Sequence, residues 1–163
     1  MTINIKILSF IALAMLLNGC SWLMIGTHPK PASYKYYSKD FKLQVNAALK
    51  TDGFYYYNYI DKKSGESYYS YLRFYNDGKV NYKITKGTPE IIKESYWPFN
   101  DVYGYYHLDG NHITYELKSN YGTYRHGEGE VINDSLSLKI LDKRSNGDTT
   151  YYCKYIFHSG FAQ

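Results

Sequence analysis

The amino-acid sequence predicts an all-β protein, an eight-stranded antiparallel up-and-down barrel, and three observations support this. Tyrosine, which favours pleated half-buried strands, occurs 22 times in 163 residues. From Gly53 onward, apolar and polar residues alternate in short segments. Turn sequences such as Asn76-Asp77-Gly78 and Asn146-Gly147 separate these segments at short, even intervals. Strands joined in chain order can close into a barrel that has no free edge.

The first 19 residues have the features of a secretory signal peptide. Lys6 supplies a positive charge, an apolar run extends from Ile7 to Leu17, and the small residue Gly19 ends the segment. The run is too short to span a bilayer as a permanent helix. We therefore expect residues 1–19 to be removed from the mature protein.

Cys20 follows this segment directly. The sequence Leu17-Asn18-Gly19-Cys20 resembles the lipobox of bacterial lipoproteins. The resemblance implies that Cys20 becomes the first mature residue, carries palmitate or a similar acyl chain, and anchors the protein in an envelope membrane. Ser21 resembles an outer-membrane sorting signal, which implies the outer membrane, facing the periplasm, if the host is Gram-negative. The alternative is an ordinary signal peptide followed by a chance cysteine.

The mature chain is expected to divide into a lipidated tether, residues 20–40, and a barrel domain, residues 41–158. Two prolines in His28-Pro29-Lys30-Pro31 block a helix in the tether. Apolar residues at helical spacing predict a short helix at Asp40–Lys50, capped by Asp40. Because some of them also alternate, a strand is the competing interpretation. The residues concerned are Phe41, Leu43, Val45, Ala48 and Leu49.

The barrel strands are delimited by their turns. In chain order they are expected at Gly53–Ile60, Ser67–Tyr75, Lys79–Thr85, Val102–Leu108, Asn111–Lys118, Thr123–Val131, Ser135–Leu141 and Thr149–Phe157. A one-residue slip exchanges the buried and exposed faces of a strand, so the alternation tests the register at each turn.

Three turns give a consistent register. A three-residue turn with Gly78 left-handed pairs Phe74 with Val80, whereas a two-residue turn would pair core residues with charged ones. At Asp109-Gly110-Asn111, either two-residue choice keeps the apolar residues on one face. At Asn146-Gly147, a type I′ turn places Ile140 opposite Cys153, so we interpret Cys153 as a buried small apolar residue.

The sixth strand gives two incompatible answers. Pairing across Asn133-Asp134 places Gly127 and Gly129 on the inner face, whereas pairing across Ser119-Asn120 places His126 there. Either a bulge lies near the two glycines, or Arg125 points inward. The sequence does not decide between them.

Charge and reactive side chains point away from several functions. Lys and Arg number 19 and Asp and Glu 15, giving a net charge of +4 with no basic run, which argues against a nucleic-acid partner. His107 and His112, and the carboxylates Glu128 and Glu130, are adjacent pairs too incomplete to predict a metal site or a glycosidase. We find no nucleophile elbow or phosphate loop. We therefore expect neither an enzyme nor a cofactor.

Three phrases resemble those of the lipocalin-like (calycin) barrels. They are Leu72–Val80 (LRFYNDGKV), Gly104–Ile113 (GYYHLDGNHI) and Gly129–Leu138 (GEVINDSLSL). Gly53-Phe54-Tyr55 departs from the pattern, because lipocalins usually place tryptophan after the glycine of this strand. The resemblance implies a container for one small apolar or amphipathic molecule.

The leading hypothesis is therefore an envelope lipoprotein that binds such a molecule inside its barrel. The long connection Lys86–Asp101, with a helix start at Pro89, is expected to lie over the mouth as a lid or to plug the end of the core. The candidate ligand-binding residues are Tyr82, Trp97, Tyr106, Tyr115, Arg125 and Tyr155.

The alternative is a structural or interaction lipoprotein with a filled core. Its outward tyrosines would contact an envelope protein or glycan, because a phenol presents an apolar ring with a polar tip. The same rings could instead cover one another across the strands. The candidates are Tyr69, Tyr71, Tyr75, Tyr103 and Tyr105.

Overall fold

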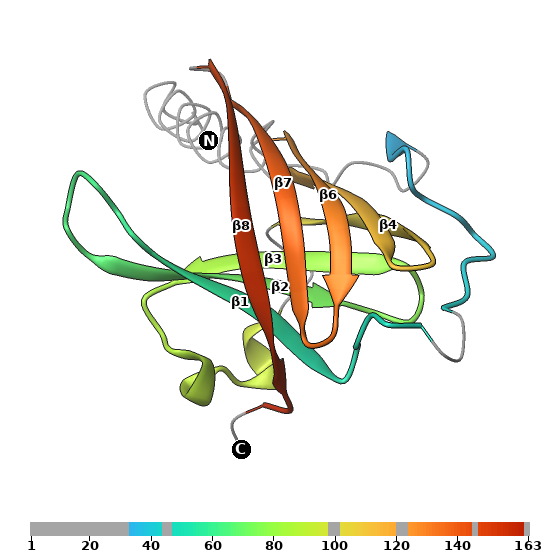
Figure 1. The fold of residues 1–163 in the computed structure, drawn as a ribbon, viewed down its shortest axis with the longest axis horizontal. Helices are drawn as coiled ribbons and strands as arrows, with labels where there is room; N and C mark the ends of the chain where they lie inside the picture. The colour runs from blue at the N-terminus through green and yellow to red at the C-terminus, as the bar shows by residue number, and fades with distance from the viewer. Residues whose placement is uncertain (1–32, 44–46, 98–101, 120–123, 145–146, 162–163) are drawn as a thin grey trace, which may run out of the picture.

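The computed structural model describes residues 33–43, 47–97, 102–119, 124–144 and 147–161, and these form one closed antiparallel barrel with its strands in chain order (Figure 1). The predicted fold class is confirmed. The strands are β1 (Gly53–Ile60), β2 (Ser67–Phe74), β3 (Lys79–Thr85), β4 (Val102–Asp109), β5 (His112–Ser119), β6 (Tyr124–Ile132), β7 (Ser135–Arg144) and β8 (Gly147–Ser159). The predicted signal peptide and the predicted lipidation site, Cys20, lie outside the described residues.

The β2–β3 and β4–β5 registers agree with those derived from the turns. Phe74 pairs with Val80, and Gly78 has a left-handed backbone with φ of 83°. The Gly78 amide donates to the Tyr75 carbonyl at 3.1 Å, as a type I turn requires. In the next hairpin Tyr106 pairs with Tyr115, so both rings enter the barrel.

The predicted β7–β8 register is wrong by two residues. Leu138 pairs with Cys153 and Ile140 with Tyr151, so Ile140 is not opposite Cys153. A shift of two keeps every side chain on its face, and the alternation of apolar residues therefore cannot detect it. The observed register extends the ladder to Arg144 and Gly147 and lets the Tyr155 hydroxyl reach Ser70 at 2.6 Å.

The ambiguity in β6 is resolved in favour of an inward Arg125. β6 pairs without interruption with β5 and β7, so Arg125 lies opposite both Leu117 and Asp142. Gly127 is the next inward position, and the Tyr115 ring occupies the space where its side chain would be. The pairing with β5 thus differs from the one expected across Ser119-Asn120.

Side chains fill most of the barrel interior. Residues of all eight strands form one buried cluster, comprising Tyr55, Leu72, Phe74, Val80, Tyr106, Ile113, Tyr115, Leu117, Val131, Leu136, Leu138, Ile140, Cys153 and Tyr155 together with Leu49. Cys153 is a free thiol within this core, and burial raises its pKa to about 12.

The segment before β1 closes the barrel end that carries the β2–β3, β4–β5 and β6–β7 turns. Leu49 is buried in the core, and the Phe41 ring packs edge-on against Tyr106 with centroids 5.0 Å apart. The short helix predicted at Asp40–Lys50 is not seen where this segment is described, because residues 40–43 and 47–50 form only turns, bends and irregular backbone. Leu49 belongs to the core cluster, and Phe41, Leu43 and Ala48 pack against it.

The long connection between β3 and β4 covers the outside of the barrel and not its mouth. It contains two short 3₁₀ helices, η2 (Pro89–Ile91) and η3 (Glu94–Tyr96), which lie below β1 and β2 in Figure 1. Trp97 packs with Phe54 and Tyr71 in a second buried cluster, at ring distances of 6.0 and 6.3 Å. The lid interpretation and the place of Trp97 at the mouth were therefore wrong, because outward Phe54 and Tyr71 need a cover.

An N-terminal strap, residues 33–41, lies against the outer face of β4 and β5 (blue in Figure 1). The Tyr34 hydroxyl donates to the Tyr103 carbonyl at 3.3 Å, and the Lys35 amide donates to the buried carboxylate of Glu116. Residues 33–40, which were expected to belong to the tether, therefore contact the barrel.

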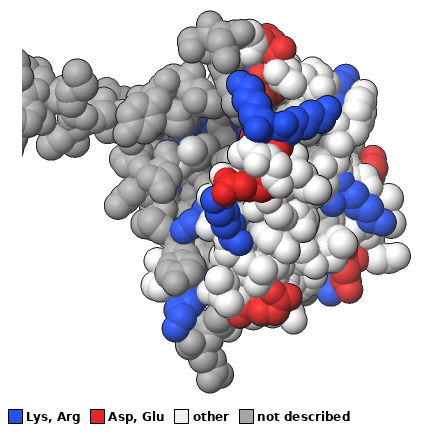
Figure 2. Space-filling view, turned by 90° about the vertical axis from the view of Figure 1, so that its left-hand side faces the viewer, with Lys and Arg blue, Asp and Glu red and all other residues white. Residues whose placement is uncertain are grey.

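Charges of both signs are interspersed with neutral surface on the face drawn in Figure 2. No helix within the described ranges combines the length and apolar character needed to cross a membrane.

Candidate functional site

The barrel end opposite the one closed by Phe41 and Leu49 holds a cavity of about 320 Å³, which we call the open-end cavity. This volume lies at the small end of the range for small-molecule sites. Inward-facing residues of β1, β2, β3, β6, β7 and β8 form its wall. The lining residues are Tyr57, Tyr59, Ser70, Tyr82, Ile84, Arg125, Asp142, Thr149, Tyr151 and Tyr155.

A buried ion pair lies in the wall of this cavity. Arg125 and Asp142 pair across β6 and β7, and they are only 5% and 2% exposed. Arg125 donates to both carboxylate oxygens, from Nε at 2.8 Å and from Nη2 at 2.6 Å. The guanidinium also lies 3.9 Å from the ring centroid of Tyr82. Bidentate geometry and a stacked ring hold the planar guanidinium in one orientation.

The groups around this pair are in defined protonation states. Burial disfavours the charged guanidinium, but the hydrogen bonds to Asp142 and the electrostatic effects of Tyr82, Tyr151 and Asp142 together outweigh it and raise the pKa of Arg125. Burial also raises the pKa of Tyr151 and of Tyr155, so both phenols are protonated at neutral pH. With Arg125 cationic and Asp142 anionic, the formal charges of the cavity wall cancel.

Two buried polar atoms near the cavity have no hydrogen-bond partner within the described structure, Nη1 of Arg125 and the hydroxyl of Tyr115. By contrast, Tyr155 and Ser70 satisfy each other at 2.6 Å. An unpaired buried donor costs about 1–3 kcal/mol. An interior that is otherwise apolar and closely packed thus keeps unused hydrogen-bonding capacity at one end.

This difference predicts that the Tyr→Phe substitutions at positions 155 and 115 change the free energy of unfolding differently. Tyr155→Phe removes the partner of Ser70 and should lower the free energy of unfolding by about 1 kcal/mol. Tyr115→Phe removes an unpaired hydroxyl and should leave that free energy unchanged or raise it by about 1 kcal/mol. Urea unfolding of the two variants measures both values. Equal destabilisation would mean that the Tyr115 hydroxyl is satisfied in the folded protein.

Three of the six residues predicted to bind ligand line the open-end cavity: Tyr82, Arg125 and Tyr155. Tyr115 is fully buried beside Gly127, further into the barrel. Tyr106 serves the closed end, where its hydroxyl donates to the Tyr75 carbonyl at 2.9 Å. Trp97 lies outside the barrel.

Sequence reasoning missed Asp142, the partner of Arg125. The predicted strand stopped at Leu141, one residue short, although β7 continues to Arg144. Continuing the inward series of Leu138 and Ile140 would have placed Asp142 inside the barrel. The other lining residues that were missed are Tyr57, Tyr59, Ser70, Ile84, Thr149 and Tyr151.

The outward tyrosines proposed for surface contacts are mostly covered. Tyr71 is 0% exposed beneath the β3–β4 connection, and Tyr105 is 4% exposed because Tyr34 and Tyr37 of the strap pack on it at 5.1 and 4.9 Å. These two therefore do not present free rings, which corrects that expectation. The remaining three, Tyr69, Tyr75 and Tyr103, are half-buried.

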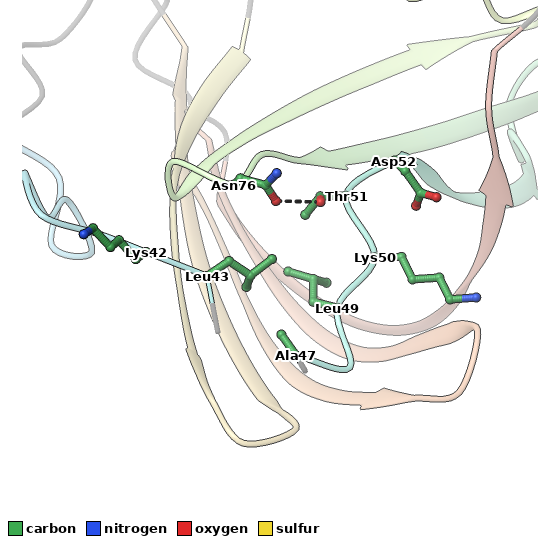
Figure 3. Close-up of a pocket in the computed structure, with 8 residues that line it drawn as sticks. All are labelled: Lys42, Leu43, Ala47, Leu49, Lys50, Thr51, Asp52 and Asn76. Carbon is green, nitrogen blue, oxygen red and sulfur yellow. Dashed lines mark hydrogen bonds between the residues drawn. The ribbon is translucent and has the colours of Figure 1, made fainter. Parts of the chain in front are cut away.

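Other polar groups make no comparable site. His112 lies 3.3 Å from Glu130 and 3.8 Å from Glu128, all exposed. Within the described ranges, no three or more side chains that could bind a metal come together. A second hollow of about 570 Å³ at the closed end is a more open groove, in which the Thr51 hydroxyl donates to the side-chain Oδ1 of Asn76 at 2.7 Å (Figure 3). Its lining residues are Lys42, Leu43, Ala47, Leu49, Lys50, Thr51, Asp52 and Asn76.

Comparisons of the chain with protein-family models, with curated proteins and with solved structures find no match. The likeness to lipocalins therefore consists of the closed eight-stranded antiparallel barrel itself.

Proposed function

We propose that this protein is a lipid-anchored protein of the bacterial cell envelope whose barrel binds one small amphipathic molecule in the open-end cavity. The observation that supports this most directly is Arg125, a buried cation with an unpaired Nη1 in a tyrosine-lined wall. Closely packed cores rarely keep such a donor without a use. Binding is favoured over catalysis, because Arg125 and Asp142 are engaged with each other and Ser70 with Tyr155.

The packing limits the size of the molecule. Side chains fill the barrel from its closed end, at Phe41, to Tyr115, so a long acyl chain cannot extend along the barrel axis. A cavity of about 320 Å³ suits a compound of one or two rings. Such a molecule would be bound at the mouth, with its apolar part against the phenol rings and its polar part toward Arg125.

Filling the cavity mouth tests this function. Ile84 lines the cavity and is 41% exposed, so Ile84→Trp should fold and occupy the mouth with an indole. Native mass spectrometry of the full chain purified from its host is expected to detect a retained small molecule on the wild type and at least tenfold less on Ile84→Trp. Ile156→Trp is the matched control, because Ile156 is 49% exposed and does not line the cavity. Equal retention by all three proteins would overturn the site.

The anchor has an independent test. Cys20→Ala should move the protein from the membrane to the soluble fraction of host cells, because a diacylated or triacylated cysteine supplies the hydrophobic attachment. Cys153→Ala is the control, since Cys153 is buried in the barrel and should not affect fractionation. Membrane association that survives Cys20→Ala would contradict the lipoprotein assignment.

A further inference from the structure

We propose that the open-end cavity selects an uncharged planar molecule that presents a carbonyl-type oxygen to Arg125, and that it discriminates against the corresponding carboxylate. This inference rests on the proposed function and names the chemistry of its ligand. The first argument concerns donors. Arginine has five N–H groups in a fixed plane. Asp142 accepts from Nε and Nη2, and Nη1 is left buried and without a partner in the described structure. The matching ligand group is an acceptor.

The second argument concerns charge. The open-end cavity has one cation and one anion, and Asp142 already neutralises Arg125 at 2.6 Å. No further Lys or Arg is among its lining residues, and the protonated phenols of Tyr151 and Tyr155 add no charge. A carboxylate would lose its hydration here and lie close to a second carboxylate, which is doubly unfavourable. An amide, ketone or lactam oxygen accepts the same hydrogen bond without either cost.

The third argument concerns shape. Five tyrosines from β1, β3 and β8 surround the cavity. Tyr57 stacks on Tyr59 with centroids 6.2 Å apart and packs against Tyr155 at 5.8 Å, while Arg125 covers one face of Tyr82. Flat aromatic walls favour a flat ligand, because offset stacking and edge-to-face contacts both need a ring as partner. The volume admits a bicyclic ring and little more.

Two probes of matched shape test the proposal on the full chain, 2-naphthamide and 2-naphthoate at pH 8, with affinities measured by ligand-observed NMR titration. The amide is expected to bind at least tenfold more tightly than the carboxylate. In the double variant Arg125→Met/Asp142→Leu, which keeps an uncharged wall but removes the donor, the amide should bind at least tenfold more weakly than it binds to the wild type. Circular dichroism is the control that checks whether the double variant is folded. Ile84→Trp should abolish binding of both probes, and Ile156→Trp should leave binding unchanged.

The outcomes separate this inference from the function beneath it. Binding of naphthoate as tight as that of naphthamide would overturn the carbonyl preference, as would amide binding that the double variant retains in full. If neither probe binds while a host molecule is retained by wild type and lost in Ile84→Trp, the binding function stands and the proposed ligand class fails. If no molecule is retained and no probe binds, both fail.

Discussion

Asp142→Leu is expected to lower the free energy of unfolding by about 3–5 kcal/mol, because it leaves the Arg125 guanidinium buried without a counterion. The two side chains are only 7% and 2% exposed, so little solvent reaches the guanidinium. Urea unfolding followed by circular dichroism measures the change. We expect the loss to appear as a lower denaturation midpoint with an unchanged slope.

Two comparisons isolate the buried pair. Arg125→Met/Asp142→Leu should recover most of the lost stability, because replacing both members of a buried ion pair by apolar residues is often neutral or stabilising. Glu66→Leu breaks an ion pair with Lys86 in which the two side chains are 46% and 58% exposed, and it should change the stability very little. A double variant as unstable as Asp142→Leu alone would show that packing, and not charge, accounts for the effect.

Gly127→Ala is expected to destabilise the barrel by about 1–3 kcal/mol or more, by overpacking. A Cβ at this position would lie 2.2 Å from two carbons of the Tyr115 ring and 2.6 Å from its hydroxyl oxygen. The ring is 0% exposed, because other side chains of the core surround it. Thermal or urea unfolding of the single variant measures the cost.

A second substitution tests the cause. Tyr115→Leu removes the opposing ring, so Gly127→Ala should cost little in that background, and the double-mutant cycle should give a coupling energy above about 1 kcal/mol. Gly87→Ala is a control, because its nearest contact would be the flexible end of Ile91 at 3.3 Å. Additive effects of the two substitutions would mean that the ring is not what excludes a side chain at Gly127.

Turn residues and the alternation of apolar residues were enough to predict the fold. They did not predict which outward side chains are buried by another segment of the chain. Turn residues such as Gly78 defined the strands and the β2–β3 register, because their backbone requirements are local. The β7–β8 register was missed, since a shift of two preserves the alternation. Trp97 was misplaced because alternation says that Phe54 and Tyr71 face outward but not that another segment buries them.

The candidate site was predictable in part for the same reason. Arg125 was recognised as a residue that could point inward, whereas its partner Asp142 lay beyond the predicted strand end. An ion pair between neighbouring strands depends on their register, and the register of β6 is the one that the turn sequences left undecided. Once β6 is aligned with β7, the two residues fall opposite each other.

The pairing of β1 with β8 has a consequence for how the polypeptide acquires its shape. Gly53 of β1 pairs with Ser159 of β8, so the hydrogen bonds between these two strands form only after β8 has been synthesised. Contacts between such distant segments are slow to form, because the intervening loop must first be closed. The nascent chain therefore passes through a stage with two unprotected edges, and premature termination before β8 should yield a species prone to aggregate.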